Sequence, residues 1–350
     1  LMEHARDAAA PLAPAPVTVI VGHQAAAVRE ALGARGCRFA IQEPQLGTGH
    51  ALLQAEGALT GATGDVLLLS GDVPSLQTET IRALVDAHRT AGAAATVLTA
   101  DIVQPDGYGR VVRNPAGRAT RIVEHKDATA EERTIQEINS GVYVFDLAPL
   151  FDGLRRIGSS NAQGEYYLPD LIARYVDQGL TVETMTLPNA NEIKGVNSRV
   201  ELAALSREMR LRKCEELMLA GVTIEDPATT YIDAAVEVGP DTTIHPNVSL
   251  EGSTLVGARC EIHSGSRLVN ARVEDDVLVR NHCVIIDSSV ASKATIGPFA
   301  HLRPESSVGE NAHVGNFVEL KKTSMAAGAN GNHLAYLADA VIGGDVNVGA

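Results

Sequence analysis

Aliphatic residues recur every six positions through the second half of the chain. The ladder runs Val238, Ile244, Leu250, Val256, Ile262, Leu268, Val273, Val279, Ile285, Val290, Ile296, Leu302, Val308, Val314 and Leu320. Twelve of its fourteen steps span six residues and two span five. This period fits neither a helix, which repeats about every 3.6 residues, nor an alternating strand, which repeats every two. It is typical of a solenoid whose coil has three short flat sides, each of which buries one aliphatic side chain.

The ladder is interrupted between Leu320 and Ile342. We interpret this interval as a loop ejected from the prism, and loops on rigid scaffolds often carry function. Polar residues gather near the interruption, namely Arg303, Lys321, Lys322, His333 and Tyr336. Because His333 is one of 11 histidines, a catalytic base and an ordinary surface residue remain equally open at this point.

The first half alternates apolar, β-rich runs with helical stretches. Strands are predicted at 17–21, 38–42, 65–70, 94–100, 110–113, 119–125 and 142–145. This order predicts an α/β domain with a mostly parallel sheet covered on both faces. Ligands of such sheets bind beyond the carboxyl ends of the strands. The residues at those ends are Gln42, Ser70, Gly71 and Asp72, and later Glu124 and Asn139.

A helix without Pro or Gly is predicted at 199–220, with Gly221 at its C-terminal cap. It gives a three-part division: a first domain at 1–198, a linker helix at 199–221 and the solenoid at 222–350. The chain opens at Leu1 in a helical stretch and closes at Ala350 within a hexad. Since solenoids need a polar cap at each end, we expect a fragment that lacks the N-terminal strand and the C-terminal coils.

The composition excludes several kinds of partner. A formal net charge of −14 argues against nucleic acid, and no apolar run is long enough to insert into a membrane. The four cysteines, Cys37, Cys214, Cys260 and Cys283, lie far apart without a CxxC pair. They indicate reduced thiols of a cytoplasmic protein rather than a disulfide framework or a zinc site.

Two motifs in the first half are ambiguous when taken alone. Gly47 and Thr48 open a helix, where free backbone N–H groups can bind an anion or a polar ring, although an ordinary strand–loop–helix turn is the favoured interpretation. Asp72 follows the most hydrophobic strand and could hold Mg²⁺ against phosphate oxygens or cap the helix expected near Ser75. Asn197 is the candidate second ligand, with a helix N-cap as its alternative.

Taken together, these residues resemble the bacterial bifunctional N-acetylglucosamine-1-phosphate uridylyltransferases and glucosamine-1-phosphate N-acetyltransferases. The resemblance spans almost the whole chain. It rests on the ordered blocks QLGTGHA, GDVP, GYGR, IVEHKDAT, NAQGEYYLPD, GVNSR, IGPFAHLRP, HVGNFVELKK and NHLAYLADA. The family implies a Rossmann-like nucleotidyltransferase domain followed by a left-handed parallel β-helix of hexapeptide repeats. The left hand comes from the family and not from the period.

For the first domain the resemblance implies uridylyl transfer from UTP to N-acetylglucosamine 1-phosphate, with release of pyrophosphate. Residues matching the family's uridine, phosphate, metal and sugar contacts are Gln42, Gly47, Thr48, Ser70, Gly71, Asp72, Gly109, Glu124, Asn139 and Asn197. Asp72 and Asn197 match the two Mg²⁺ ligands. Positioning and charge neutralisation would supply most of the rate acceleration.

For the second domain the resemblance implies acetyl transfer from acetyl-CoA to glucosamine 1-phosphate. His333 matches the catalytic base. The sugar-phosphate contacts match Arg303, Lys321, Tyr336 and Asn347, and a coenzyme A contact matches Ala350. The family is a homotrimer whose acyl sites are shared between neighbouring prisms, and its product supplies peptidoglycan and lipopolysaccharide precursors.

The sequence also departs from the family. The glycine-rich loop that holds UTP phosphates would precede Leu1, and Pro169, Asn332 and Ala338 differ from the family pattern. Residues 1–350 alone are therefore expected to have little of either activity. The alternatives are a monofunctional sugar-phosphate nucleotidyltransferase with a structural trimerisation β-helix, and a non-catalytic trimeric scaffold.

Overall fold

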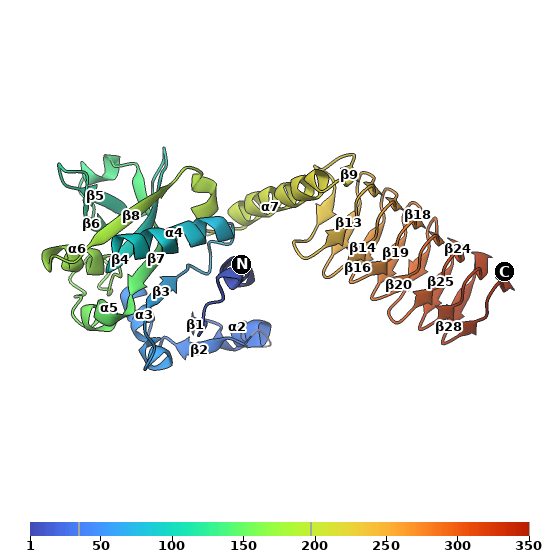
Figure 1. Cartoon of the computed structure of the whole chain (residues 1–350), viewed down its shortest axis with the longest axis horizontal. Coiled ribbons are helices and arrows are strands. Elements are labelled where there is room, and N and C mark those ends of the chain that lie inside the picture. Colours follow the sequence, from blue (N-terminus) through green and yellow to red (C-terminus); the bar gives the residue numbers. More distant parts are fainter. Residues whose placement is uncertain (34–35, 197, 350) are drawn as a thin grey trace. The chain divides into compact units, whose positions relative to one another are not determined.

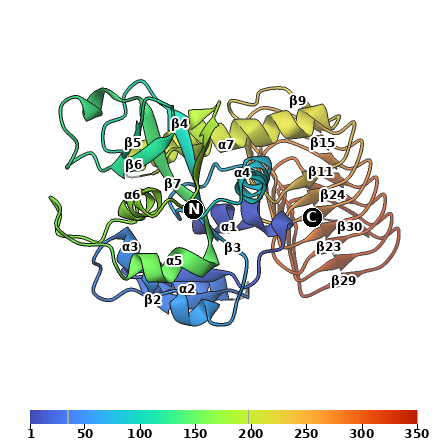
Figure 2. The same cartoon turned by 60° about the vertical axis from the view of Figure 1, so that its left-hand side comes forward.

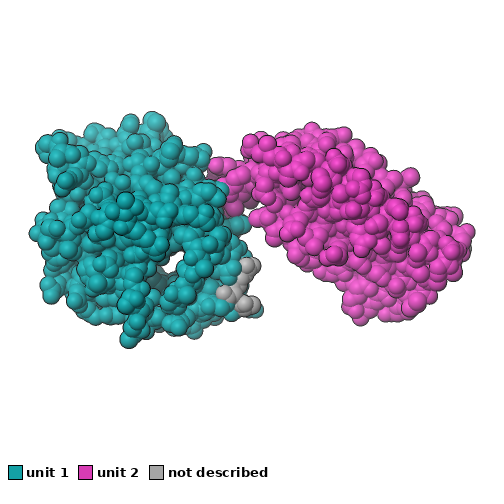
Figure 3. Space-filling model, in the orientation of Figure 1, with its two compact units in different colours: residues 1–199 teal, residues 200–350 magenta. Residues whose placement is uncertain are grey.

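The computed structural model describes residues 1–33, 36–196 and 198–349. The chain divides into two compact units, Leu1–Arg199 and Val200–Ala350 (Figure 3). Each unit is described by itself below.

The helices of the first unit cover a central sheet. They are α1 (Met2–Ala9), α2 (Ala25–Leu32), α3 (Thr48–Leu53), α4 (Thr78–Ala91), α5 (Leu147–Leu154) and α6 (Asp170–Asp177), with 3₁₀ turns at Ala10–Leu12, Glu56–Leu59, Glu132–Thr134 and Ala190–Ile193. The strands are β1 (Thr18–Val21), β2 (Arg38–Ile41), β3 (Asp65–Leu68), β4 (Ala95–Asp101), β5 (Arg110–Arg113), β6 (Ala119–Val123), β7 (Glu137–Asp146) and β8 (Val182–Leu187).

The main sheet has the order β6-β5-β7-β4-β8, with β3 paired to β7 (Figure 1), and β1 pairs with β2 in a separate parallel ribbon. Although the sequence predicted a mostly parallel sheet, the pairing is mixed. The long strand β7 is antiparallel to β3, β4 and β5, and β5 is antiparallel to β6, while β4 and β8 are parallel. Apolar patterning cannot reveal this, because a strand buried on both faces has the same composition in either direction.

Strand β4 is the centre of the first unit's core. Ala95, Val97 and Leu98 are fully buried, because helix α4 covers one face of the strand and α5 and α6 pack on the other side of the core. Helix α1 lies beside α4 (Figure 2), and its Ala8 carbonyl accepts a hydrogen bond from the Thr78 hydroxyl at 2.8 Å. Strand β8 was not predicted, since its VETMTL sequence alternates only weakly.

The second unit is a parallel β-helix with three flat sides. One side stacks β10 (Tyr231–Ile232), β13 (Ser249–Glu251), β16 (Arg267–Val269), β19 (Val284–Ile286), β22 (His301–Leu302), β25 (Glu319–Lys321) and β28 (Tyr336–Ala338). The second stacks β11 (Glu237–Val238), β14 (Leu255–Val256), β17 (Arg272–Val273), β20 (Ser289–Val290), β23 (Ser307–Val308), β26 (Ser324–Met325) and β29 (Val341–Ile342). The third stacks β9 (Thr223–Ile224), β12 (Thr243–Ile244), β15 (Glu261–Ile262), β18 (Leu278–Val279), β21 (Thr295–Ile296), β24 (His313–Asn316), β27 (Asn330–His333) and β30 (Asn347–Val348).

The predicted ladder forms the core of this β-helix. Ile244 pairs in register with Ile262, and Leu268 with Ile285, and all four side chains are fully buried. The six-residue period is therefore confirmed as one inward residue on each side of a three-sided coil.

The predicted ejected loop between Leu320 and Ile342 is wrong. Strands β26, β27 and β28 continue all three sheets through this interval. Met325 and Gly331 take inward positions of the ladder and are buried, and Leu337 packs partly buried against the same core. The spacing looked broken because methionine and glycine do not belong to the Val, Ile and Leu class from which the ladder was built.

Helix α7 (Arg199–Leu219) precedes the first coil. Its Cys214 and Leu217 are buried in the same core as Val222 of that coil, and the Arg210 guanidinium lies 4.0 Å from the centre of the Tyr231 ring. Cys214, Cys260 and Cys283 are buried free thiols, and Cys37 is half-buried. Among the described helices, none combines the length and apolar character needed to span a membrane.

Candidate active sites

The turn after β2 is held against the loop that leads into α6. Gln42 donates from its Nε2 to the Gly47 carbonyl at 2.9 Å, and the Thr48 hydroxyl accepts from the Leu168 amide at 3.0 Å. Gly47 has φ +102°, and a Cβ there would lie 2.8 Å from the Tyr166 carbonyl oxygen. Glycine is therefore required at this position by both backbone conformation and close approach. The predicted residues Gln42, Gly47 and Thr48 do lie together.

The strand-end segment after β3 contacts the segment that leads into α7. The Ser70 hydroxyl donates to the Gly141 carbonyl at 3.2 Å, and the Asp72 carbonyl accepts from the Val196 amide at 3.2 Å. The next helix, α4, begins only at Thr78 after Gln77, so Asp72 does not cap it. The Asp72 side chain is exposed and has no hydrogen bond or ion pair within the described residues. Asn197, the other predicted ligand, lies outside the described residues.

Gly71 adjoins the first helix of the chain. A Cβ added at Gly71 would lie 2.9 Å from Cγ of Met2 in α1. This neighbour is a flexible side chain rather than backbone, so it can give way.

A third group of predicted residues meets where β5, β6 and β7 converge. The Asn139 amide donates to the Gly109 carbonyl at 2.9 Å, and a Cβ at Gly109 would lie 3.4 Å from Oε1 of Glu124. The Asn139 Oδ1 accepts from the Gly141 amide at 3.1 Å. Ser70 contacts the same Gly141, so this residue connects the strand-end segment to this group.

Glu124 is the electrostatic focus of this group. Burial raises the pKa of its carboxyl above the ordinary value, and the carboxylates of Asp127, Asp170 and Glu165 raise it further. The side chain is half-buried and has no hydrogen-bond or ion-pair partner among the described residues. A partly desolvated carboxylate without a protein donor suits a ligand that brings its own O–H or N–H group.

Arg110 is a component that the sequence reasoning missed. It follows Gly109, is fully buried, donates to the Tyr108 carbonyl and lies 3.4 Å from Nδ1 of His125, the residue after Glu124. Burial lowers the pKa of its guanidinium. The GYGR block contained this arginine, but sequence alone gives no sign that its side chain points inward.

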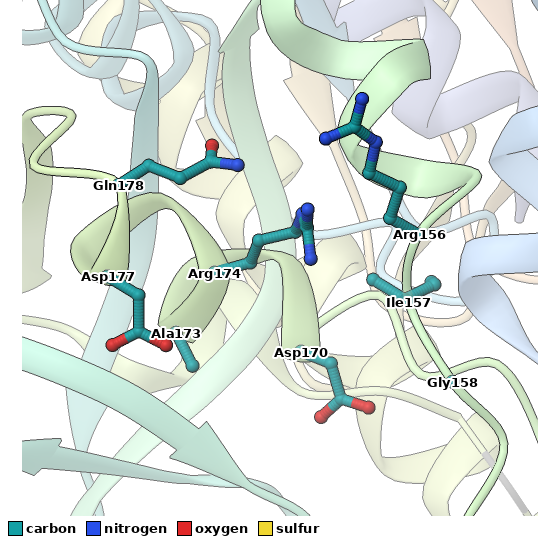
Figure 4. Close-up of a pocket in the computed structure, with 8 residues that line it drawn as sticks. All are labelled: Arg156, Ile157, Gly158, Asp170, Ala173, Arg174, Asp177 and Gln178. Atoms are coloured by element: carbon teal, nitrogen blue, oxygen red, sulfur yellow. The ribbon is translucent and has the colours of Figure 1, made fainter.

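Figure 4 shows one pocket of the first unit. It encloses about 330 Å³ between the end of α5 and helix α6, and Arg156, Asp170 and Arg174 line it. No predicted site residue lines it within the described part of the chain.

The residues predicted for acetyl transfer lie on the last described coils of the β-helix. Arg303 follows β22 and Lys321 ends β25, side by side on one face, and the Arg303 Nε donates to Glu319 at 2.6 Å. Tyr336 lies on β28 opposite Glu319. These four side chains form a mixed-charge surface on that face.

His333 lies on the neighbouring face and not on a loop. It ends β27 opposite Asn316, and the corner at Leu334 leads directly to Tyr336 on β28. Asn347 accepts a hydrogen bond from Nδ2 of Asn332 at 3.1 Å. Three of these side chains are exposed, namely His333, Tyr336 and Asn347. The described residues of one chain therefore bring them to one corner of the β-helix but do not bury them. Ala350 lies outside the described residues.

Comparison with known proteins identifies the relatives of this chain. Residues 1–138 match the MobA-like NTP transferase domain. The chain is 47% identical to the bifunctional protein GlmU of Pelobacter propionicus, in an alignment covering 99% of this chain and 75% of that protein. It is also 47% identical to GlmU of Koribacter versatilis, covering 100% and 75%, and 49% identical to GlmU of Anaeromyxobacter dehalogenans (strain 2CP-C), covering 97% and 70%.

These matches extend through both units and confirm a nucleotidyltransferase domain followed by a β-helix. They also disfavour a nucleotidyltransferase whose β-helix serves only assembly, because the relatives that align with both units are named bifunctional proteins. The chain therefore belongs to the GlmU family of bifunctional enzymes, which are uridylyltransferases and acetyltransferases of UDP-N-acetylglucosamine synthesis.

Proposed function

We propose that the connected groups on the first unit form the uridylyltransferase site, and that the corner around His333 forms the acetyltransferase site. The observation that carries the first assignment is Gly141. Its carbonyl accepts from Ser70 and its amide donates to Asn139, so one residue joins the strand-end segment to the group that holds Glu124. A nucleotide phosphate and a sugar bound at these two places would be neighbours.

In the proposed uridylyl transfer, the phosphate of N-acetylglucosamine 1-phosphate attacks the α-phosphorus of UTP in line, and pyrophosphate leaves. Gln42, Gly47 and Thr48 hold the uridine, because their turn offers amide and hydroxyl groups at a fixed position. Glu124 accepts from a sugar hydroxyl and Asn139 donates from its Nδ2, since its Oδ1 is already used by Gly141. Positioning of the two phosphates supplies most of the rate acceleration.

The residues present fit a Mg²⁺ ion. Asp72 offers an exposed carboxylate, and the hydrogen bond from Val196 to its backbone brings the residue before Asn197 next to it. Mg²⁺ takes one or two protein oxygens together with phosphates and waters. When bound, the ion would neutralise phosphate charge as the new bond forms.

In the proposed acetyl transfer, the 2-amino group of glucosamine 1-phosphate attacks the thioester carbonyl of acetyl-CoA while His333 takes a proton from the amine. The C–S bond then breaks, and coenzyme A leaves as its thiol after taking up a proton. Arg303 and Lys321 bind the sugar phosphate, and two adjacent cations suit a dianion. Tyr336 and Asn347 contact the sugar phosphate, and Ala350 contacts coenzyme A. The exposure of this corner supports a homotrimer in which a neighbouring prism completes the site. We place the enzyme in the cytoplasm, where UTP and acetyl-CoA are available.

The metal assignment is tested by calorimetric titration of the native protein with UTP at increasing Mg²⁺. We expect Mg²⁺ to tighten UTP binding in the wild type and in Asp86→Ala, which removes an exposed carboxylate from α4. Asp72→Ala should abolish the Mg²⁺ dependence. An unchanged Mg²⁺ dependence in Asp72→Ala would show that this carboxylate is not the ligand.

A further inference from the structure

The first coils of the β-helix carry a cluster of histidine and carboxylate side chains that is separate from both candidate active sites. Its members are Glu225, His245, Glu261 and His263. None of them belongs to the coils that hold Arg303, Lys321 or His333. We propose that His245, Glu261 and His263 bind one divalent transition-metal ion, with Zn²⁺ as the preferred ion, and that Glu225 orients His245.

The coil geometry explains why these residues meet. Strands β12 and β15 are paired in register, with Ile244 opposite Ile262, and both isoleucines are fully buried. The residues that flank an inward residue point outward on the same face. Glu261 and His263 therefore project together. His245 projects beside His263 from the preceding coil, and its amide donates to the Ile262 carbonyl of the next coil at 3.0 Å.

The donor atoms already converge. Nε2 of His245 and Nε2 of His263 lie 3.2 Å and 2.9 Å from the same Oε1 of Glu261, and the three ligand atoms all lie within 4.8 Å of one another. Ligand atoms around a tetrahedral Zn²⁺ with bonds of about 2.0–2.1 Å are separated by about 3.3 Å. Small side-chain adjustments would thus place all three at bonding distance, and the fully buried isoleucines fix the backbone that carries them.

Glu225 supplies the outer contact typical of zinc-binding histidines. Its Oε2 lies 3.0 Å from Nδ1 of His245. If a metal ion replaced the contact between Nε2 of His245 and Glu261, Nδ1 would carry the proton and donate to Glu225, and Nε2 would bind the metal. This carboxylate–histidine arrangement fixes the ring orientation and strengthens the ligand in known zinc sites.

The charges around the cluster favour a cation. Two carboxylates face the site, with Glu225 at 3.0 Å from Nδ1 of His245 and Glu261 at 3.2 Å from its Nε2. Arg280 occupies the next position along this column, after Val279, but no ion pair joins it to Glu261 among the described residues.

The donor set selects the kind of metal. Two imidazoles and one carboxylate suit Zn²⁺ and its neighbours in the first transition row, whereas Mg²⁺ and Ca²⁺ prefer oxygen ligands alone. The side chains of His245, His263 and Glu261 are 25%, 27% and 52% exposed. A fourth coordination position would therefore face solvent, and the bound ion would fasten two consecutive coils together.

The test is titration of the metal-stripped native protein with ZnCl₂ against a chromophoric chelator. Every protein in this test carries Asp72→Ala, so that zinc bound at the proposed Mg²⁺ site is not counted. The protein with this substitution alone is the parent. We expect one zinc per chain at micromolar or tighter affinity. His263→Gln and Glu261→Gln should each weaken it at least about 100-fold, and Glu225→Gln about 10-fold. The matched control is His282→Gln, because His282 lies in the same β-helix but stacks on Phe299, and it should bind zinc like the parent.

Cobalt provides a second readout that does not depend on affinity. With CoCl₂ the parent and His282→Gln should show the visible absorption of a tetrahedral cobalt site, and His263→Gln should not. Zinc should also raise the melting temperature of the parent but not of His263→Gln. The proposal is overturned if the parent binds no zinc at micromolar concentration, or if His263→Gln and Glu261→Gln bind it as the parent does. Either result would leave the cluster as a set of surface ion pairs.

Discussion

Two neighbouring glycines in the β-helix should respond in opposite ways to the same substitution. A Cβ at Gly315 would lie 1.8 Å from the backbone oxygen of Asn332 and 2.5 Å from its carbonyl carbon. A Cβ at Gly331, one coil further on, would find its nearest neighbours at 3.9 Å, all of them atoms of apolar side chains. Gly315→Ala must therefore move backbone, whereas Gly331→Ala fills available space.

The size of both effects follows from these distances. Real Cβ atoms essentially never approach closer than 3.0 Å, so the strand that carries Asn332 must retreat from Gly315 by more than 1 Å. Overpacking of this kind costs about 3 kcal/mol or more. For a unit of this size, that corresponds to a fall of roughly 6–12 °C in melting temperature. Gly331→Ala should raise stability by about 0.5–1 kcal/mol, because alanine restricts the unfolded chain.

The displacement should also reach the acetyltransferase site. Asn316, which follows Gly315, is paired with His333, so the proposed base moves with the backbone of Asn332. A misplacement of about 1 Å lowers turnover by about 100-fold. Uridylyl transfer should be unchanged in both variants, since its proposed residues all lie in the other unit.

The assay is thermal unfolding followed by circular dichroism, with both activities measured on the same native-protein preparations. Equal melting temperatures for the two variants would refute the reasoning about space. Full acetyl transfer by Gly315→Ala would show that His333 does not depend on the position of this strand.

Two other predictions concern stability. Because burial and neighbouring carboxylates raise the folded-state pKa of Glu124, the stability it contributes is present below the pKa of an unfolded glutamate and is lost as pH rises through the folded value. As the pH rises from about 4 to about 8, the melting temperature of Glu124→Gln should therefore increase relative to that of the wild type. The melting temperature of Glu132→Gln should decrease relative to the wild type over the same range, because the hydrogen bond from the Thr129 amide lowers the pKa of Glu132. Melting curves across that range check both signs, and parallel curves would contradict them. Ile285→Ala leaves a cavity at a fully buried position between Leu268 and Leu302, and it should lower the free energy of unfolding in urea by about 2–5 kcal/mol. Val341 is 87% exposed, so Val341→Ala should lower it by less than about 0.5 kcal/mol. Equal losses in the two variants would contradict the assigned core.

The β-helix could be predicted from the sequence because each flat side buries one residue, so a single spacing encodes the whole architecture. The same reasoning failed at Met325 and Gly331, where a different residue type fills the same inward position. Packing then depends on volume, which a class of aliphatic residues does not describe. The position of His333 on a strand, rather than on a loop, follows from that correction.

Other features required three-dimensional pairing. The antiparallel insertion of β7 leaves no mark on apolar patterning, although it brings Asn139 next to Gly109. The cluster of His245 and His263 is invisible until the coil length is known, because residues 18 positions apart become neighbours only when the coil closes on itself. The family motifs grouped Glu124 with Gly109, and the two residues lie close together. The motifs gave no indication that the Glu124 carboxylate has no partner among the described residues.

The central claim is that one chain carries two independent sites, and the most direct test measures both activities on two variants of the native protein. We predict that His333→Ala abolishes acetyl transfer from acetyl-CoA to glucosamine 1-phosphate and retains uridylyl transfer, and that Asp72→Ala does the reverse. If His333→Ala retains acetyl transfer, or if either substitution abolishes both activities in folded protein, the assignment of two separate sites is contradicted.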